Sequence, residues 1–346
     1  MQRKFSLNNL DLLRLLAATQ VLIFHSIHHL NISNLGYWTV ILEYFPGVPV
    51  FFVISGYLIS RSFEKKHDIK NYFRNRFLRI YPGLWGCILA TIITASIFGS
   101  INFLNKPAFA WLIAQLVGII YTPAFLKNYG FGSYNGALWT IPIELQFYIV
   151  MPAFYFLLKK LNQFKYFFLI LWVFFICLSF FLKKEFPAMG TIHESIFEKL
   201  LRYTFAPNIW LFLTGVLLQR GNAFQSKWIY GKGIFWLAAY IALSIMLPTS
   251  DIMTFVMMLL LGVTTISLAY TMPSLAGKLL KGNDISYGVY LYHGVIINVF
   301  IQLSFIGHLS LIWYILLISY TLAFISWKLI EKPMMKKKVN ALLVPR

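Results

Sequence analysis

The chain has 346 residues, of which 59% are hydrophobic and only 12% carry a charge. A typical soluble domain carries roughly 25% charged residues, so this composition excludes a disordered chain, a coiled coil and a soluble enzyme with one membrane anchor. A helix needs roughly 20 apolar residues to cross a bilayer, so the apolar content suffices for about ten such helices. We therefore expect an all-α polytopic membrane protein, with residues 1–346 forming a single transmembrane domain.

The net charge of +19 arises from 30 Lys and Arg residues against 11 Asp and Glu residues. In a membrane protein such residues collect in cytoplasmic loops and meet anionic lipid headgroups. No basic stretch is interleaved with aromatic residues on a soluble face, so we predict membrane lipids as partners and not nucleic acid. Cys87 and Cys177 lie in apolar segments, which is typical of small core residues rather than of a disulfide or metal framework.

The N-terminus imitates a signal peptide, because basic residues precede an apolar run. Arg14 interrupts that run, and His25, His28 and His29 stand where small residues would precede a cleavage site. We therefore predict an uncleaved first membrane helix.

Apolar segments follow one another along the chain. The segment 107–125 is ambiguous, because Pro107 and Pro123 leave only about 15 apolar-dominated residues between them, which is short for a span. The basic and aromatic segment 64–82 suits a cytoplasmic interfacial helix that ends before Pro82. We predict spanning helices at about 8–30, 44–63, 83–104, 138–158, 166–182, 204–219, 229–247, 252–271, 285–304 and 310–330.

The distribution of basic residues orients these ten segments. With both termini cytoplasmic, 23 of the 30 basic residues fall on the inner side and six on the outer side, with Arg14 inside a span. This is a strong positive-inside pattern. A full span at 107–125 would place Lys336–Lys338 outside, so we predict that 107–125 is an external, partly embedded helix. The inner set includes Arg3, Lys4, Lys66 and Arg346, and the outer set is Lys106, Lys127, Lys183, Lys184, Lys199 and Arg202.

Ionisable side chains inside predicted spans are informative, because each costs roughly 2.5 kcal/mol or more at mid-bilayer. Arg14 and His25 are 11 residues apart in the first span, which on a helix corresponds to three turns plus about 20° and a rise of roughly 16 Å. They should share a face, with Asp11 placed to orient Arg14. The cation would hold an anionic head of a long donor and the imidazole would sit at its reacting end. A snorkelling arginine and a core histidine are the alternative interpretations.

His25, His28 and His29 also suggest a metal site, but no carboxylate or cysteine lies near them in sequence, and we predict no metal. Glu144 lies in the outer half of the fourth span after Trp139 and should be paired or line a cavity. It is a candidate to orient a histidine or bind a sugar hydroxyl, and a structural ion pair is the alternative.

Three further groups are candidates. Ser55 and Gly56 allow close approach of another helix or of a ligand. Arg76 and Arg79 share a face of a basic cluster with Arg74 and are placed to grip phosphates, although a positive-inside bias alone also explains them. In the ninth span, Tyr290 and His293 pair at i,i+3 and could line a cavity, whereas Tyr287 fits an interfacial aromatic belt.

Taken in order, these motifs resemble the acyltransferase-3 family of membrane O-acyltransferases, which modify bacterial surface glycans and other glycosides. Each motif is weak alone, but six in family order span about residues 8–335. They are Leu10-Asp11-x-x-Arg14 with His25; Phe51-Phe52-x-x-Ser55-Gly56-Tyr57-Leu58-Ile59; Arg76-x-x-Arg79-Ile80-x-Pro82; Leu138-Trp139-Thr140-x-Pro142-x-Glu144-x-Gln146-Phe147-Tyr148; Ser286-Tyr287-x-x-Tyr290-x-x-His293; and Ile330-Glu331-Lys332-Pro333.

The resemblance implies ten spans, cytoplasmic termini and acyl-CoA, usually acetyl-CoA, as the cytoplasmic donor. It implies that Arg14 and His25 are an essential pair, that Arg76 and Arg79 belong to a conserved basic motif, and that Glu144 is a conserved carboxylate. Some members carry an extra span and a C-terminal SGNH hydrolase-like domain. We expect that domain to be absent, because the sequence ends 16 residues after Ile330.

We therefore predict an O-acetyltransferase of the bacterial cytoplasmic membrane that acts in polysaccharide modification of the cell envelope. His25 would be catalytic with Glu144, Arg14, Arg76 and Arg79 would bind the donor, and Asp11, Ser55, Trp139, Tyr290 and His293 would line the cavity. His25 would act as general base or as transient acyl carrier. A transporter or flippase for glycans or acylated metabolites is the alternative, and the acceptor, acyl length and oligomeric state are left open.

Overall fold

In the computed structural model, residues 4–33, 36–65, 68–191, 193–248 and 250–337 are described, and these residues form helices and loops without a strand. The basic residues Arg3, Lys66, Lys338 and Arg346 of the charge count lie outside the described residues. Seven helices in the described part are long and apolar enough to cross a membrane. The prediction of an all-α polytopic membrane protein is confirmed. The seven are Leu10–His29, Thr39–Lys65, Ile69–Phe98, Gly136–Lys160, Phe167–Glu185, Asp251–Ala269 and Leu311–Lys336.

Each predicted spanning segment contains a helix. The helices are α1 (Leu10–His29), α3 (Gly47–Lys65), α4 (Ile69–Phe98), α6 (Thr140–Lys160), α7 (Phe167–Glu185), α9 (Ile209–Arg220), α10 (Gly233–Met246), α11 (Asp251–Ala269), α13 (Ser286–Gln302) and α14 (Leu311–Ser326). Of these, α9 and α10 are shorter apolar helices. Large apolar side chains such as Ile97, Ile149 and Leu317 are more than 60% exposed, as expected for helix faces that contact lipid.

The ambiguous segment 107–125 begins as helix α5 (Lys106–Leu116) and continues irregularly. The side chain of Asn105 caps the helix by accepting a hydrogen bond from the Ala108 amide at 2.8 Å, and Pro107 fits the first turn because its missing N–H needs no partner there. A helix of this length rises only about 16 Å, which is too short to cross a bilayer. Its external position stays a prediction.

The prediction that a separate helix ends before Pro82 is wrong, because α4 runs without a break from Ile69 to Phe98 with Pro82 inside it. A proline interior to a helix removes one backbone hydrogen bond, and membrane helices tolerate it where neighbouring groups compensate. Pro82 leaves the Leu78 carbonyl without its usual i−4 helical partner. The hydroxyl of Tyr287 donates to another carbonyl of α4, that of Ile80, at 3.0 Å. Tyr287 thus bonds helix α4, a contact that an interfacial aromatic belt does not require.

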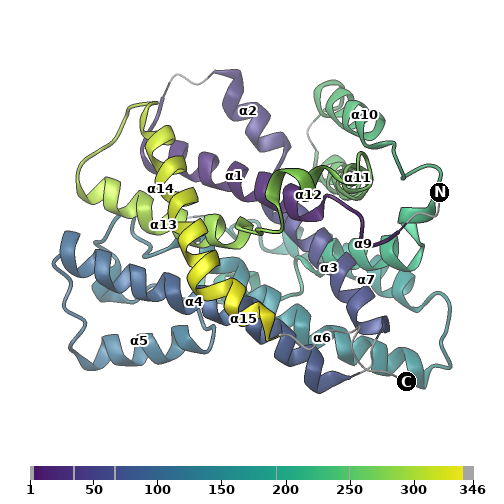
Figure 1. Cartoon of the computed structure of the whole chain (residues 1–346), viewed down its shortest axis with the longest axis horizontal. Coiled ribbons are helices and arrows are strands. Elements are labelled where there is room, and N and C mark those ends of the chain that lie inside the picture. Colours follow the sequence, from purple (N-terminus) through teal and green to yellow (C-terminus); the bar gives the residue numbers. More distant parts are fainter. Residues whose placement is uncertain (1–3, 34–35, 66–67, 192, 249, 338–346) are drawn as a thin grey trace. The chain divides into compact units, whose positions relative to one another are not determined.

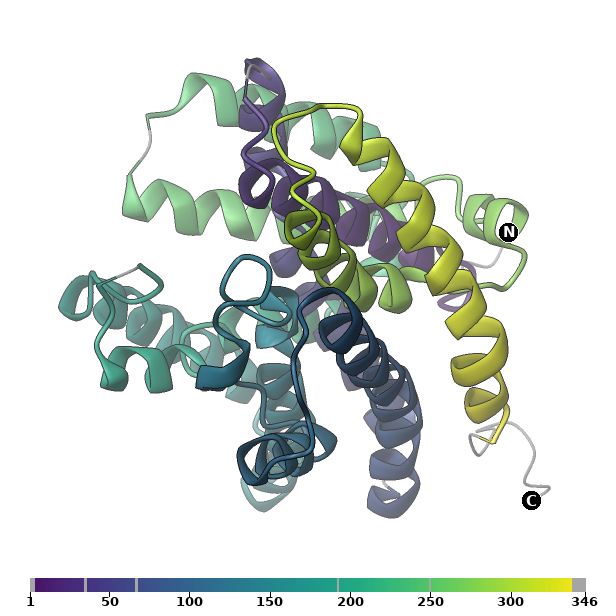
Figure 2. The same ribbon diagram turned by 90° about the vertical axis from the view of Figure 1, so that its left-hand side faces the viewer.

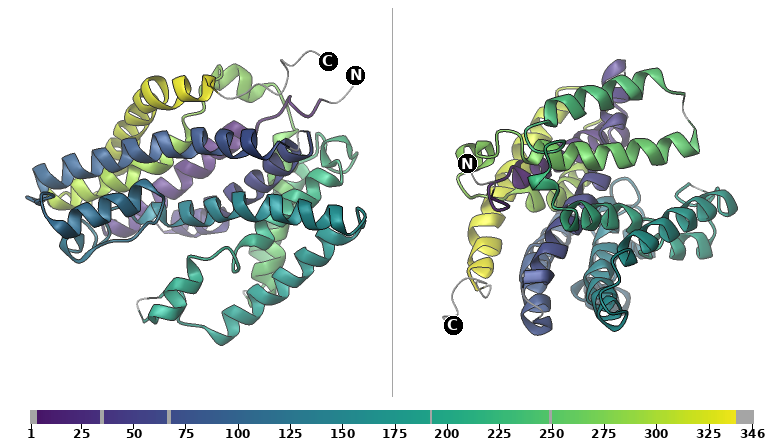
Figure 3. Two further views of the ribbon diagram at one scale, coloured as in Figure 1. Left: turned by 90° about the horizontal axis from the view of Figure 1, so that it is seen from below. Right: turned by 90° about the vertical axis from the view of Figure 1, so that its right-hand side faces the viewer.

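The described residues divide into two compact units, and the division falls within α1 after Arg14. The first unit includes Val48–Ile69 and Ile143–Gly282, and therefore α7, α9, α10 and α11. Helices α10 and α11 lie side by side as an antiparallel pair (Figure 3, right). Short helices in this unit are α8 (Ile196–Arg202), η3 (Ala223–Gln225) and α12 (Leu275–Leu280).

Two glycines bring α3 and α9 together in the first unit. A Cβ atom on Gly56 would lie 1.9 Å from the Phe212 carbonyl oxygen, and one on Gly215 would lie 2.0 Å from the Val53 carbonyl oxygen. Small residues permit this close backbone approach between membrane helices. The structure therefore gives Gly56 a packing role.

The second unit contains Leu15–Gly47, Lys70–Pro142 and Asn283–Arg346, within the described residues. In this unit α13 and α14 pack side by side. Helix α14 continues into η4 and α15 as one uninterrupted helical segment (Figure 2, yellow). Helix α5 returns alongside α4 (Figure 1), and the indole of Trp85 donates to the Leu116 carbonyl at 3.0 Å. The remaining elements are α2 (Tyr37–Tyr44), η1 (Ala124–Leu126), η2 (Gly136–Trp139), η4 (Trp327–Glu331) and α15 (Lys332–Lys336).

Candidate active site

Two histidines from distant parts of the sequence form a pair in the second unit. The Nδ1 atom of His25 on α1 lies 3.0 Å from the Nε2 atom of His293 on α13. His293 is completely buried, whereas His25 is half-buried. His25 and His293 were each predicted as site residues, and the structure brings them into contact. The residue spacing within either helix does not indicate this contact.

The surroundings of this pair are aromatic and histidine-rich. The ring of His29 lies 5.5 Å from that of His25 and stacks on the ring of Phe131 at 3.8 Å. The exposed His28 is turned back, with its Nδ1 atom 2.9 Å from the Phe24 carbonyl oxygen. Among the described residues no three of His, Cys, Asp and Glu come together as a metal site.

Tyr290 and His293 lie on neighbouring turns of α13 with ring centroids 6.0 Å apart. The Tyr290 hydroxyl lies 2.8 Å from the Thr140 hydroxyl and donates to the Ala137 carbonyl at 2.6 Å. Tyr290 therefore holds the polypeptide at η2 against α13. Trp139, at the end of η2, is half-buried.

Asn135 also connects η2 to α13. Its amide donates to the Leu291 carbonyl at 2.8 Å, and its side-chain oxygen accepts from the Ala137 amide at 3.3 Å. A Cβ atom on Gly294 would lie 2.2 Å from the Asn135 side-chain oxygen. Only glycine at position 294 permits this contact next to His293.

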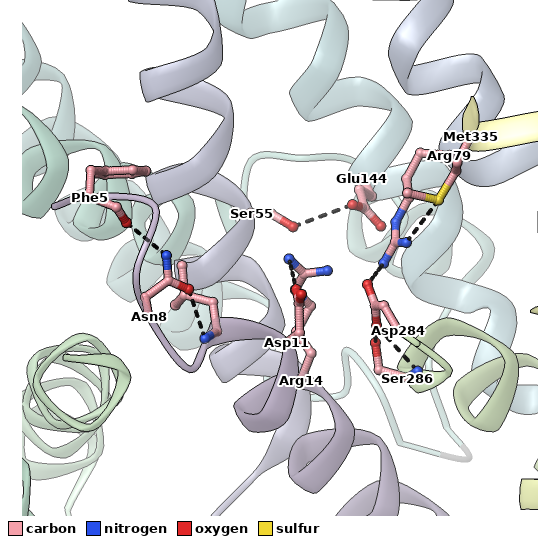
Figure 4. Close-up of polar contacts among 11 residues, drawn as sticks. Phe5, Asn8, Asp11, Arg14, Ser55, Arg79, Glu144, Asp284, Ser286 and Met335 are labelled. Carbon is pink, nitrogen blue, oxygen red and sulfur yellow. Dashed lines mark hydrogen bonds and ion pairs between the residues drawn. The ribbon is translucent and has the colours of Figure 1, made fainter. Parts of the chain in front are cut away.

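In the first unit Arg14 is paired with Asp11, as its position one turn earlier predicted. Nη2 of Arg14 lies 3.2 Å from the Asp11 carboxylate, and the Arg14 side chain is 17% exposed (Figure 4). One helix, α1, carries Arg14 and His25, as predicted.

Glu144 also lies in the first unit, on α6. Its Oε1 atom accepts hydrogen bonds from the Ser55 hydroxyl at 3.3 Å and from the Tyr148 hydroxyl (Figure 4). Both of these contacts are made by neutral hydroxyl donors. Tyr148 belongs to the same sequence motif as Glu144 and lies one turn from it on the same face, but it was not among the predicted site residues.

Arg79 on α4 binds Asp284, in the loop before α13, at 2.7 Å, and both side chains are largely buried. Asp284 accepts from the Ser286 hydroxyl at 2.5 Å and the Ser286 amide at 3.4 Å (Figure 4). Arg76, one turn before Arg79, instead has its guanidinium 5.6 Å from the ring centre of Tyr72. Asp284 was not among the predicted site residues. The sequence signal that could have indicated it is an acidic residue two positions before Ser286, the serine at which α13 begins.

Comparison with known proteins gives one family. Residues 7–329 match the family model of the acyltransferase domain of the acyltransferase-3 type. No solved structure matches the chain.

Individual relatives cover most of the chain. It is 30% identical to nodulation protein 10 of Rhizobium leguminosarum bv. viciae, over 96% of this chain and 94% of that protein. It is 26% identical to an O-acetyl transferase of Shigella phage Sf6, over 94% and 95% of the two chains. It is 31% identical to the peptidoglycan O-acetyltransferase OatA of Listeria monocytogenes, but over only 42% of this chain and 24% of that protein.

Proposed function

Because this chain belongs to the acyltransferase-3 family and is a membrane-bound acyltransferase of the O-acetyltransferase type, we propose that it transfers an acetyl group from cytoplasmic acetyl-CoA to a hydroxyl of a cell-surface glycan or glycoside. The observation that carries the proposal is the location of the His25 imidazole and its hydrogen bonding. It lies within a helix of membrane-spanning length and, among the described residues, its ring makes a hydrogen bond only to His293.

The donor side of the proposal depends on charge. The positive-inside pattern places Arg76 and Arg79 on the cytoplasmic side, where acyl-CoA is present. We assign the negatively charged nucleotide end of the donor to these two arginines, with Arg14 as a further donor-binding residue, because guanidinium groups match phosphate geometry. Arg79 is held in place for this by Asp284.

The chemistry needs a base at the acceptor hydroxyl. His25 would take the hydroxyl proton as the oxygen attacks the thioester carbonyl, a C–O bond forms, the C–S bond breaks, and the proton passes to the departing CoA sulfur. In the alternative with an acetyl-histidine intermediate, the same lone pair would attack the thioester carbonyl and CoA would leave as the thiolate. The acceptor oxygen would then attack the acetyl group, the C–N bond would break, and the hydroxyl proton would pass to the CoA thiolate. Glu144, with hydrogen bonds from Ser55 and Tyr148, is the carboxylate we assign to the acceptor hydroxyls. Asp11, Ser55, Trp139, Tyr290 and His293 complete the proposed set of lining residues.

The acceptor class is supported by the relatives. The Listeria relative is described as acting on peptidoglycan and the phage relative as an O-acetyl transferase. Both cellular relatives named above are bacterial, which favours the bacterial cytoplasmic membrane as the location. A glycan or glycoside carries the hydroxyl groups that such an ester requires.

The test is acetyl-CoA turnover by the full chain in lipid nanodiscs, followed as free thiol release with and without a crude glycan extract. We expect turnover by the wild type and His28→Gln, and none by His25→Ala, with all three expressed equally. Wild-type turnover by His25→Ala would refute the proposed role of His25. No donor turnover and no donor binding by the wild type would favour the transporter alternative.

A further inference from the structure

The carbonyl of Val289 determines where protons lie in the histidine pair. Nδ1 of His293 is 3.1 Å from the Val289 carbonyl oxygen, and a carbonyl oxygen can only accept a hydrogen bond. Nδ1 of His293 must therefore carry a proton. Val289 is one turn before His293 on α13, so this bond is built into the helix itself.

The proton on Nδ1 leaves the other nitrogen of His293 with a lone pair. A neutral imidazole has one donor nitrogen and one acceptor nitrogen. A second proton would give a positive charge to a side chain that has no exposed surface, and a buried charge without a paired anion is costly. Nε2 of His293 is therefore an acceptor in the resting pair.

His25 must then donate to it. Nε2 of His293 lies 3.0 Å from Nδ1 of His25, so the proton of this bond belongs to Nδ1 of His25. Nε2 of a neutral His25 consequently has a lone pair and no proton. In the described residues this atom makes no hydrogen bond to the protein, and His25 is half-buried where His293 is fully buried.

We propose that His293 is a positioning residue that holds His25 in the tautomer whose Nε2 atom is the base, with Val289 fixing His293 in turn. This inference rests on the proposed function of His25. The arrangement uses the general logic in which a third group orients a catalytic histidine through Nδ1–H, with a neutral imidazole in place of a carboxylate.

The neutral orienting group has a chemical consequence. When His25 takes the acceptor's proton on Nε2, its Nδ1–H bond to His293 becomes a charge-assisted hydrogen bond, which is stronger than the neutral one. The pair thus favours the protonated His25 that exists only after attack begins. Among the residues that the structure describes, no carboxylate bonds His25, so no anion holds it charged beforehand and the base is available in the resting enzyme.

Neighbouring groups keep His293 where it is needed. Asn135 holds the backbone at Leu291, and Gly294 permits that contact. The ring of Tyr290 lies beside His293 with its hydroxyl bound to Ala137. In the described part of the chain, the titratable side chains whose rings lie beside the pair are His29 on α1 and Tyr290 on α13.

The test compares two variants of His293 that differ in one property. In His293→Gln the side-chain oxygen occupies a position equivalent to Nε2 and can still accept from His25, whereas His293→Leu is similar in size but accepts nothing. We expect His293→Leu to lower kcat roughly 100-fold, the lower end of what a positioned base supplies, at an unchanged KM for acetyl-CoA. His293→Gln should stay within about tenfold of the wild type, and His28→Gln should be unchanged.

A second measurement reports the tautomer directly. In the full chain labelled with ¹⁵N-histidine in nanodiscs, His25 should show a protonated Nδ1 and an unprotonated Nε2, assigned by the signals lost in His25→Ala. His293→Leu should mix the two tautomers, and His293→Gln should keep the wild-type pattern. The opposite tautomer in the wild type would overturn the inference.

The kinetic outcomes separate this inference from the proposed function. An inactive His25→Ala together with a fully active His293→Leu would overturn the role of His293 and leave that of His25 intact. An active His25→Ala would refute the proposed function itself. Equal loss of activity in His293→Gln and His293→Leu would show a structural role in packing and would likewise overturn the inference.

Discussion

Arg79 and Asp284 are joined by an ion pair of 2.7 Å that connects helix α4 to the loop preceding α13. The arginine also directs Nη1 to the sulfur of Met335 at 3.5 Å, and the aspartate is itself bound by Ser286. A guanidinium held from two sides loses little conformational freedom when a phosphate arrives. Asp284 is therefore a positioning residue for the proposed donor site.

Replacement of Asp284 tests this relationship. Asp284→Ala should raise the KM for acetyl-CoA about tenfold, equivalent to about 1.4 kcal/mol of donor binding, with a smaller change in kcat. Asp284→Asn keeps an oxygen that accepts from Arg79, so its KM should lie between the two. The measurement is thiol release against donor concentration, and a folded Asp284→Ala protein with wild-type KM would contradict the prediction.

Arg76 should act on the same parameter by a different contact. Its guanidinium lies over the ring of Tyr72, and its position three residues before Arg79 puts it on the same face of α4. We expect Arg76→Ala to raise the donor KM more than it lowers kcat, because it removes binding that ground state and transition state share.

Lys70→Ala is the matched control for Arg76, since Lys70 is an exposed basic residue on the same helix. If both variants raise KM equally, the effect is a general electrostatic attraction of the donor. The salt dependence of KM would then be the same in both variants, because exposed charges are screened in the same way.

The fold was largely predictable, because a membrane helix must satisfy its backbone polar groups internally and therefore leaves a long apolar run in the sequence. The ends of helices were less predictable. Pro82 suggested a boundary by its local chemistry, whereas α4 continues through it, and Tyr287, more than 200 positions away in sequence, bonds the Ile80 carbonyl of the same helix. Local rules contain no information on such distant contacts.

The same distinction holds for the candidate site. Pairs one turn apart, such as Asp11 with Arg14, follow from helix periodicity and were predicted. His25 and His293 were each singled out, but their contact joins two helices 268 positions apart, and no pattern within either helix specifies it. Asp284 was missed because it lies in a short polar loop, outside the spans where an ionisable residue attracts attention.

A substitution at Glu144 can separate the role of its charge from the role of its hydrogen bonds. Glu144→Gln keeps a side-chain oxygen that can accept from Ser55 and Tyr148, so the variant should fold with an unchanged unfolding midpoint. If the charge serves the acceptor hydroxyl, kcat should fall by roughly 10- to 100-fold. Wild-type kcat in this variant would assign Glu144 to structure alone.

Two neighbours serve as controls for Glu144. Ser55→Ala removes one long hydrogen bond of 3.3 Å and should change kcat by less than about threefold. Tyr148→Phe removes a second donor to the same oxygen. If Tyr148→Phe matches Glu144→Gln in kcat, the required feature is the orientation of the carboxylate and not its contact with acceptor.

Gly56 distinguishes helix packing from ligand binding, the two roles that its sequence motif allows. A Cβ atom there would lie 1.9 Å from the Phe212 carbonyl oxygen on α9, so Gly56→Ala forces the two helices apart. Overpacking of this kind costs about 1–3 kcal/mol, and the unfolding midpoint in nanodiscs should fall. Gly277→Ala on α12 is the control, because no neighbouring atom lies within 4 Å of its added Cβ and alanine has the better helix propensity. We expect Gly56→Ala to lose stability while the molecules that remain folded keep the wild-type kcat. A stable Gly56→Ala protein with reduced turnover would instead place a ligand at this position.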